Sequence, residues 1–188
     1  MARRSCRPSG GSAWNRAKSD GEKHVKSLSR SAMAPYLGQC LCGDVRYRVN
    51  KEPLTVYACH CTECQRRTGS AFAISMIVRR DDVEVLAGEA TGYFAALPDG
   101  RTKSGQMCLA CGTRLWGTPI KYPDIRIVQP GTLDQPSQLV PVAHQWVSEA
   151  QPWLPLPPGV PAWERGPSDP GEYVRLWQAR AQQERDGG

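Results

Sequence analysis

Residues 59–64 of this 188-residue chain, Cys-His-Cys-Thr-Glu-Cys, place three cysteines within six positions. One cysteine pair precedes this stretch, in Cys-Leu-Cys at 40–42, and another follows it, in Cys-Leu-Ala-Cys at 108–111. Gly43 and Gly112 each come directly after a pair, which suits a tight turn that needs positive φ. Such spacings let one turn deliver two sulfurs to one ion, and structural zinc takes thiolates in tetrahedral sets of four. The pattern therefore predicts a fold organised around zinc.

Disulfide bonds are the alternative use of these cysteines. The clusters hold seven of the eight cysteines, an odd number that cannot be fully paired, and Cys-x-Cys neighbours are poorly placed to bridge each other. The N-terminus lacks the apolar segment of a secretory signal, and no apolar run approaches the length of a membrane span. We therefore expect a cytoplasmic protein, without a membrane segment, whose thiols stay reduced and bind metal.

Seven sulfurs cannot close two four-ligand sites, so two Zn²⁺ ions per chain would leave one site with an open position, as catalytic zinc sites do. Cys59, Cys61 and Cys64 are the natural open, catalytic site. The two outlying pairs would share the closed site: Cys40, Cys42, Cys108 and Cys111. Spacing alone does not prove this partition, because His60 or another residue could close the second site. In an extended Cys-His-Cys stretch His60 points away from both cysteines, so we expect it beside the ligands or exposed rather than on the metal.

Two arginines directly follow the three-cysteine stretch. Three thiolates and one Zn²⁺ sum to a charge of −1, which Arg66 and Arg67 could offset. The same two residues are candidates to bind a substrate or cofactor carboxylate, and solvated surface arginines are an equally good interpretation.

The net charge of +6 arises in residues 1–33, which hold eight Lys/Arg and two Asp/Glu, whereas the remainder is neutral. We therefore expect no nucleic-acid binding by the folded domain. This Ser-, Gly- and Arg-rich segment has no apolar periodicity, so we expect it to be disordered. It is a tail without function, a transit peptide, or an artefact of an early start codon, and we favour translation from Met33. Cys6 is expected to be an unliganded thiol.

Strands are expected to dominate the fold, because 18 Gly and 16 Pro favour turns over long helices. Residues 45–49 alternate apolar and basic side chains, as a half-buried strand does. Pro141 argues for an edge position of the strand that contains it. Further strands are expected at 54–57, 71–78, 83–86, 91–96, 125–128 and 139–142.

One short helix is expected near the C-terminus. Ser168 or Asp169 can cap it, and three apolar residues at 173, 176 and 177 share a face that should pack on the same domain. We expect a zinc-binding domain over 34–155 and a Pro-rich extension with this helix over 156–188. The sequence carries no indication of the oligomeric state.

The clusters and their surroundings resemble the glutathione-dependent formaldehyde-activating enzyme family, which also includes centromere protein V. The resemblance runs from about residue 38 to residue 153 and is carried by residues 38–47, 59–72, 108–115 and 130–134, with all seven cysteines in matching order and spacing. It implies a mainly β fold of small antiparallel sheets around zinc, called Mss4-like. It also implies a structural zinc on the two outlying pairs and an active-site zinc on residues 59, 61 and 64. One departure is Met107, where the family usually has an aromatic residue.

The family's activity joins glutathione to formaldehyde as S-hydroxymethylglutathione, classed among carbon–sulfur lyases for the reverse reaction. The resemblance thus implies a small thiol and an aldehyde as substrates. We expect the open zinc position to bind the thiol as thiolate, the nucleophilic form. The alternative is a non-enzymatic zinc-stabilised module whose basic tail binds a polyanion, and deletion of residues 1–33 would discriminate the two.

Overall fold

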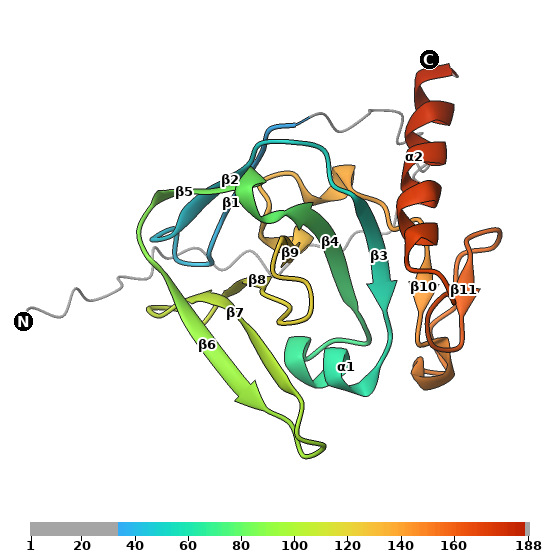
Figure 1. The fold of residues 1–188 in the computed structure, drawn as a ribbon, viewed down its shortest axis with the longest axis horizontal. Coiled ribbons are helices and arrows are strands. Elements are labelled where there is room, and N and C mark those ends of the chain that lie inside the picture. Colours follow the sequence, from blue (N-terminus) through green and yellow to red (C-terminus); the bar gives the residue numbers. More distant parts are fainter. Residues whose placement is uncertain (1–33, 187–188) are drawn as a thin grey trace, which may run out of the picture.

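The apolar runs of the sequence form two sheets in the computed structural model, which describes residues 34–186 (Figure 1). A three-stranded sheet has the order β1-β2-β5, and an eight-stranded sheet has the order β11-β10-β3-β4-β9-β8-β7-β6. Pairing is antiparallel except between β10 and its two neighbours, β3 and β11. The strands are β1 (Tyr36–Gln39), β2 (Arg46–Val49), β3 (Thr55–Cys59), β4 (Ala73–Arg79), β5 (Val83–Ala87), β6 (Ala90–Ala96), β7 (Thr102–Cys108), β8 (Arg114–Gly117), β9 (Ile125–Val128), β10 (His144–Gln145) and β11 (Ala162–Trp163).

The main core joins side chains from both sheets. Tyr47 of β2 is fully buried, and its ring meets the edge of Trp116 of β8 at a centroid distance of 5.5 Å. Gly38 of β1 makes this packing possible, because a Cβ there would lie 2.5 Å from the Tyr47 ring. Met76 and Val128 add buried apolar surface from β4 and β9, each contributing about 1.5–3 kcal/mol by its burial. The core thus fixes the ends of β1, β3 and β7, from which cysteines project.

Two α-helices accompany the sheets, α1 (Thr62–Thr68) and α2 (Gly171–Asp186). Helix α2 packs against β3, where Tyr173 stacks on Tyr57 at 4.6 Å (Figure 1). Asp169 accepts a hydrogen bond from the backbone N–H of Gly171 at its start, as expected of one of the two proposed caps. The expected packing of this helix on its own chain is therefore confirmed. Neither helix of the described residues is long and apolar enough to cross a membrane.

The mainly β fold with antiparallel sheets and a C-terminal helix is confirmed. The strand expected at 139–142 is wrong, because pairing with β3 becomes regular only at β10. A 3₁₀ turn at Pro136–Gln138 precedes that segment, and Pro141 has no N–H to donate. Between 139 and 143, the backbone hydrogen bonds to β3 are therefore limited to one at Val142 and one at Ala143. Helix α1 was missed. The disordered tail, the start at Met33 and Cys6 lie outside the described residues, and the division of the chain at residue 155 stays a prediction.

Candidate metal centres

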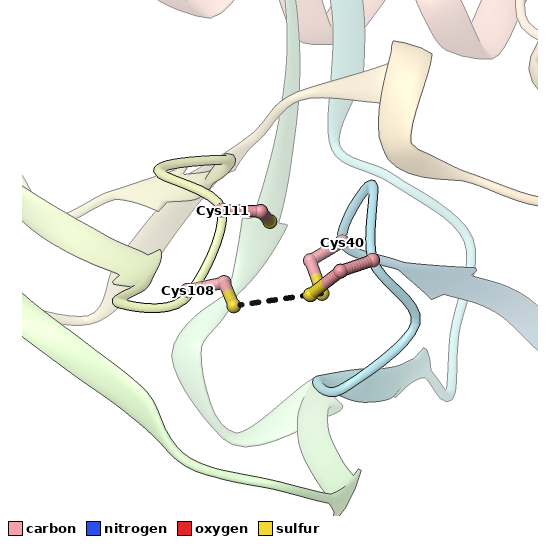
Figure 2. A group of neighbouring side chains, drawn as sticks. Cys40, Cys108 and Cys111 are labelled. Atoms are coloured by element: carbon pink, nitrogen blue, oxygen red, sulfur yellow. Dashed lines mark hydrogen bonds between the residues drawn. The ribbon is translucent and has the colours of Figure 1, made fainter. Parts of the chain in front are cut away.

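Four thiols converge where the turn after β1 meets the turn after β7. The ligand atoms of Cys40, Cys42, Cys108 and Cys111 all lie within 4.8 Å of one another. Figure 2 shows the side chains of Cys40, Cys108 and Cys111 pointing towards a common centre from two separate turns. Cys40 and Cys108 are buried, so the group lies partly inside the fold.

The local backbone makes these turns possible. Gly43 and Gly112 have φ of 78° and 72°, the positive values expected from their place after each pair. The Val45 N–H donates to Cys40 Sγ at 3.2 Å, and the Leu41 N–H donates to Thr113 Oγ1 at 3.0 Å, which ties the two turns together. Burial opposes ionisation of Cys111, but hydrogen bonds from Thr113 lower its pKa to about 6.

The spacing of these sulfurs fits zinc. Cys40 Sγ lies 3.5 Å from Cys42 Sγ, which lies 3.8 Å from Cys108 Sγ. Tetrahedral coordination at the usual zinc–sulfur distance separates neighbouring sulfurs by about 3.8 Å. A disulfide would instead need about 2.05 Å. The donor set and its dimensions therefore match a four-thiolate zinc site.

The other three clustered thiols form a second group between β3 and α1. Cys59 ends β3, Cys61 is the N-cap of α1, and Cys64 lies in its first turn. Their ligand atoms lie within 4.8 Å of one another, with 3.5 Å between the sulfurs of Cys59 and Cys61. The two groups are those expected from the sequence, and metal binding by them stays a prediction.

Ionisation in this second group is uneven. Hydrogen bonds from Cys59 and Cys64 lower the pKa of Cys61 to about 2, and the positive charge of Lys103 contributes a smaller part. The pKa of Cys59 is raised, chiefly by its hydrogen bonds to Cys61 and Cys64 and then by burial. The two neighbouring thiols therefore favour ionisation of Cys61 and disfavour ionisation of Cys59.

His60 lies outside this group of ligand atoms. It is fully buried, so the interpretation of an exposed side chain is wrong. Its expected place beside the ligands stays a prediction. Its Nε2 lies 2.8 Å from Nδ1 of His144 on β10, and its ring packs near Phe72. Burial lowers the pKa of both imidazoles, which favours their neutral forms. His60 therefore joins the end of β3 to β10 through His144.

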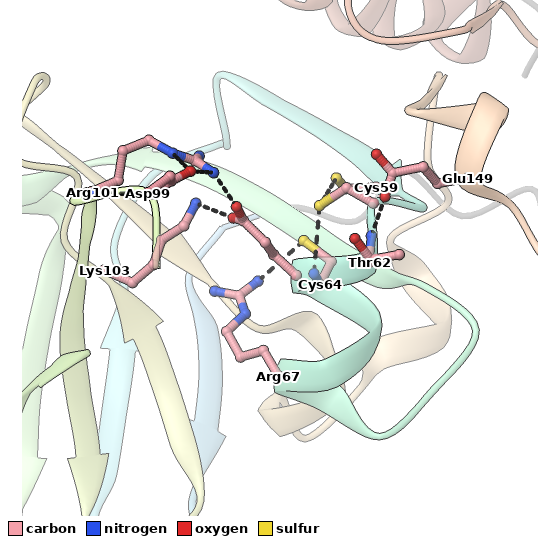
Figure 3. A network of polar contacts seen from close by, with 10 residues as sticks. Cys59, Thr62, Cys64, Arg67, Asp99, Arg101, Lys103 and Glu149 are labelled. Carbon is pink, nitrogen blue, oxygen red and sulfur yellow. Dashed lines mark hydrogen bonds and ion pairs between the residues drawn. The ribbon is translucent and has the colours of Figure 1, made fainter. Parts of the chain in front are cut away.

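Polar contacts, rather than apolar packing, hold helix α1, because none of its residues is buried. At its N-terminal end, Glu149 Oε2 accepts from the Thr62 N–H at 2.6 Å, as Figure 3 shows. Gln65 Nε2 donates to the carbonyls of His60 and Glu149, and Arg114 Nη1 donates to the Arg67 carbonyl at 3.1 Å. None of Glu149, Gln65 and Arg114 was predicted to contribute to the site. Glu149 lies in no recognised motif, and the sequence of segments 59–72 and 108–115 does not reveal the contacts of Gln65 and Arg114.

The two candidate arginines differ in position. Arg67 is half-buried, and its Nη2 lies 3.8 Å from Cys64 Sγ (Figure 3). Arg66 is exposed. The structure thus brings Arg67 to the thiols, where it can offset negative charge, and leaves Arg66 in the position of a solvated surface residue.

Known proteins resemble this chain in sequence over the region of both cysteine groups. The family model for the glutathione-dependent formaldehyde-activating enzyme matches residues 35–149, which include both cysteine groups and Glu149. A protein of Halomonas elongata, provisionally named a glutathione-dependent formaldehyde-activating enzyme, is 32% identical over 92 residues. That match covers 47% of this chain and 59% of the relative's length. The crystal structure of a Rhodobacter sphaeroides protein aligns with a TM-score of 0.42 and 21% identity, over 68% of this chain and 98% of that one.

Proposed function

Because the chain belongs to the family of glutathione-dependent formaldehyde-activating enzymes, we propose that it joins a small thiol such as glutathione to formaldehyde or a related aldehyde, or cleaves the adduct. This is the chemistry of a carbon–sulfur lyase of the S-(hydroxymethyl)glutathione synthase type. Its proposed cofactors are two zinc ions per chain, one on each cysteine group.

The observation that carries the proposal is the unequal number of sulfurs in the two groups. Cys40, Cys42, Cys108 and Cys111 can complete a tetrahedral site, whereas Cys59, Cys61 and Cys64 supply three donors. A three-donor site leaves a position for substrate, and a four-donor site does not. A zinc ion held by the three thiolates supplies a Lewis-acid position that favours the ionised form of a thiol.

The residues of the site orient the reaction. The thiolate sulfur attacks the carbonyl carbon of the aldehyde, a carbon–sulfur bond forms, and the carbonyl π electrons move to oxygen. That oxygen takes up the proton released by the thiol, so thiol and aldehyde give a hydroxyalkyl thioether without any other reactant. Arg67 supplies positive charge within 3.8 Å of Cys64 Sγ and can hold a substrate carboxylate through its fork of N–H donors. Helix α1 fixes Cys61 and Cys64 relative to Cys59 while this occurs.

Metal content and turnover measured together test the proposal. We expect two equivalents of zinc in the natural chain and one in a Cys61→Ser variant. Exchange NMR with labelled formaldehyde should show that the natural chain accelerates adduct formation with glutathione and that this variant does not. Calorimetric titration with glutathione should show binding to the zinc-loaded protein and none to the zinc-free protein. Acceleration that persists in the one-zinc variant, or no acceleration in the natural chain, would refute the function.

A further inference from the structure

The β6–β7 hairpin connects the two cysteine groups. Strand β7 ends at Cys108, in the four-cysteine group, and runs from a hairpin turn at the opposite end. Figure 1 shows this hairpin extending from the sheet towards α1, the helix that carries Cys64. Most side chains of β6 are exposed or half-buried, so apolar packing does little to position the hairpin tip.

Charged side chains attach this tip to α1. Glu63 of α1 pairs with Lys103 at 3.1 Å and with Arg101, and Arg101 also pairs with Asp99 at 2.6 Å. Figure 3 shows Arg101, Lys103 and Arg67 on the same side of α1 as the Cys64 thiol. Three cations therefore stand beside the three-cysteine group, and the two that belong to the hairpin are occupied by a carboxylate of the helix.

The ion pairs of Glu63 are suited to exchange. The Glu63 side chain is 29% exposed, and those of Lys103 and Arg101 are 47% and 58% exposed. Pairs exposed to this degree are weak, because water solvates both partners when they separate. Displacement of Glu63 from the two cations by an incoming carboxylate therefore costs little free energy. A hydroxyl or an uncharged thiol offers no such replacement.

We propose that Lys103 and Arg101 are specificity-determining residues that bind a carboxylate of the thiol substrate, and that Glu63 is the internal carboxylate that this substrate displaces. The inference rests on the proposed function, since it assigns the substrate class of that same site. The favoured thiols carry a carboxylate several bonds from the sulfur, as glutathione does. Thiols without a carboxylate leave Glu63 on its partners and gain nothing from the hairpin.

Two variants with opposite expected effects test this assignment. The measured quantity is the ratio of kcat/KM for glutathione to kcat/KM for 2-mercaptoethanol, which has no carboxylate. Lys103→Gln should lower this ratio about fivefold, the upper range for an exposed ion pair, and Glu63→Gln should raise it by a similar factor. Lys121→Gln, which removes a positive charge from another exposed segment, is the matched control and should not change the ratio. All proteins are compared at equal zinc content.

Binding without turnover separates this inference from the proposed function. S-methylglutathione keeps both carboxylates but cannot react, so calorimetry with the zinc-loaded protein should show the same opposite changes in Kd. If these changes occur while no protein turns over any thiol, the carboxylate site is supported and the proposed function fails. If turnover is normal but neither variant changes the ratio or the Kd, the inference is overturned and the function stands. A lower ratio in both variants would also overturn it, because Glu63 would then support the site rather than compete for it.

Discussion

Glu149 offers a direct test of how α1 presents two of the three thiols. Its Oε2 accepts the Thr62 N–H at 2.6 Å, directly after Cys61, and no residue of α1 is buried to compensate for the loss of that contact. Removing a side-chain cap at a helix N-terminus costs about 1 kcal/mol. We therefore expect Glu149→Ala to weaken zinc binding at the three-cysteine group roughly fivefold, since ordering α1 would then consume part of the binding free energy.

Competition with a chromophoric chelator measures this effect, because the two zinc ions should dissociate in separate phases. Only the weaker phase should shift in Glu149→Ala. Glu149→Gln keeps an amide oxygen that can accept the Thr62 N–H, so its shift should be smaller. Glu89→Ala removes an exposed carboxylate between β5 and β6 and should leave both phases unchanged. Unchanged affinity in Glu149→Ala, or equal weakening of both phases, would refute the assignment of Glu149 to the positioning of α1.

Three further predictions concern stability, each measured by denaturant unfolding of the zinc-loaded protein. Gly38→Ala should lower the free energy of unfolding by about 1–3 kcal/mol, because the new Cβ would lie 2.5 Å from the Tyr47 ring; an unchanged value would show that the ring moves freely. Cys108→Ser should lower the free energy of unfolding far more than Cys61→Ser, because Cys108 is fully buried and joins two turns that are distant in sequence. Equal losses would contradict a structural role for the four-cysteine group and a separate catalytic role for the three-cysteine group. Tyr173→Ala should cost about 3–5 kcal/mol through lost packing of α2 on β3, and a loss below about 1 kcal/mol would show that α2 is dispensable.

The cysteine clusters along the chain were predictable because their signal is local. One residue separates the two cysteines of the first pair, and the positive φ of Gly43 follows from the tight turn that this spacing requires. The alternation of apolar and basic residues in β2 and the apolar run in β4 are also local signals, because the polarity of each side chain indicates whether it faces the core or the solvent. Those signals indicated the fold class and the three cysteine clusters, whereas the sharing of one site by the two outlying pairs depends on a contact across 66 positions, which spacing alone did not prove.

The parts that were missed depend on contacts between distant residues. Helix α1 lacks an apolar face, so its sequence has no helical periodicity, and Glu149 reaches it across 87 positions of the chain. Strand β7 contains Thr, Lys, Ser, Gly and Gln in succession, so hydrophobic alternation is absent and the strand is defined by its pairing with β6 and β8. The segment at 139–142 has the composition of a strand, but Pro141 prevents a regular ladder there.

Two of the missed elements, α1 and β7, carry residues of the proposed carboxylate site, Glu63 and Lys103. The four-cysteine group constrains one end of β7 at Cys108, while Glu63 holds the other end through Lys103. The first attachment includes the buried thiols of Cys40 and Cys108, and the second is a partly exposed ion pair, so the two ends of one strand differ in how easily they can move. A hairpin fixed at its base and weakly held at its tip can accept a charged substrate beside the three thiols without disturbing the core. The four-cysteine group would therefore serve the proposed reaction although it takes no part in the chemistry, because it determines where the tip of the hairpin can reach.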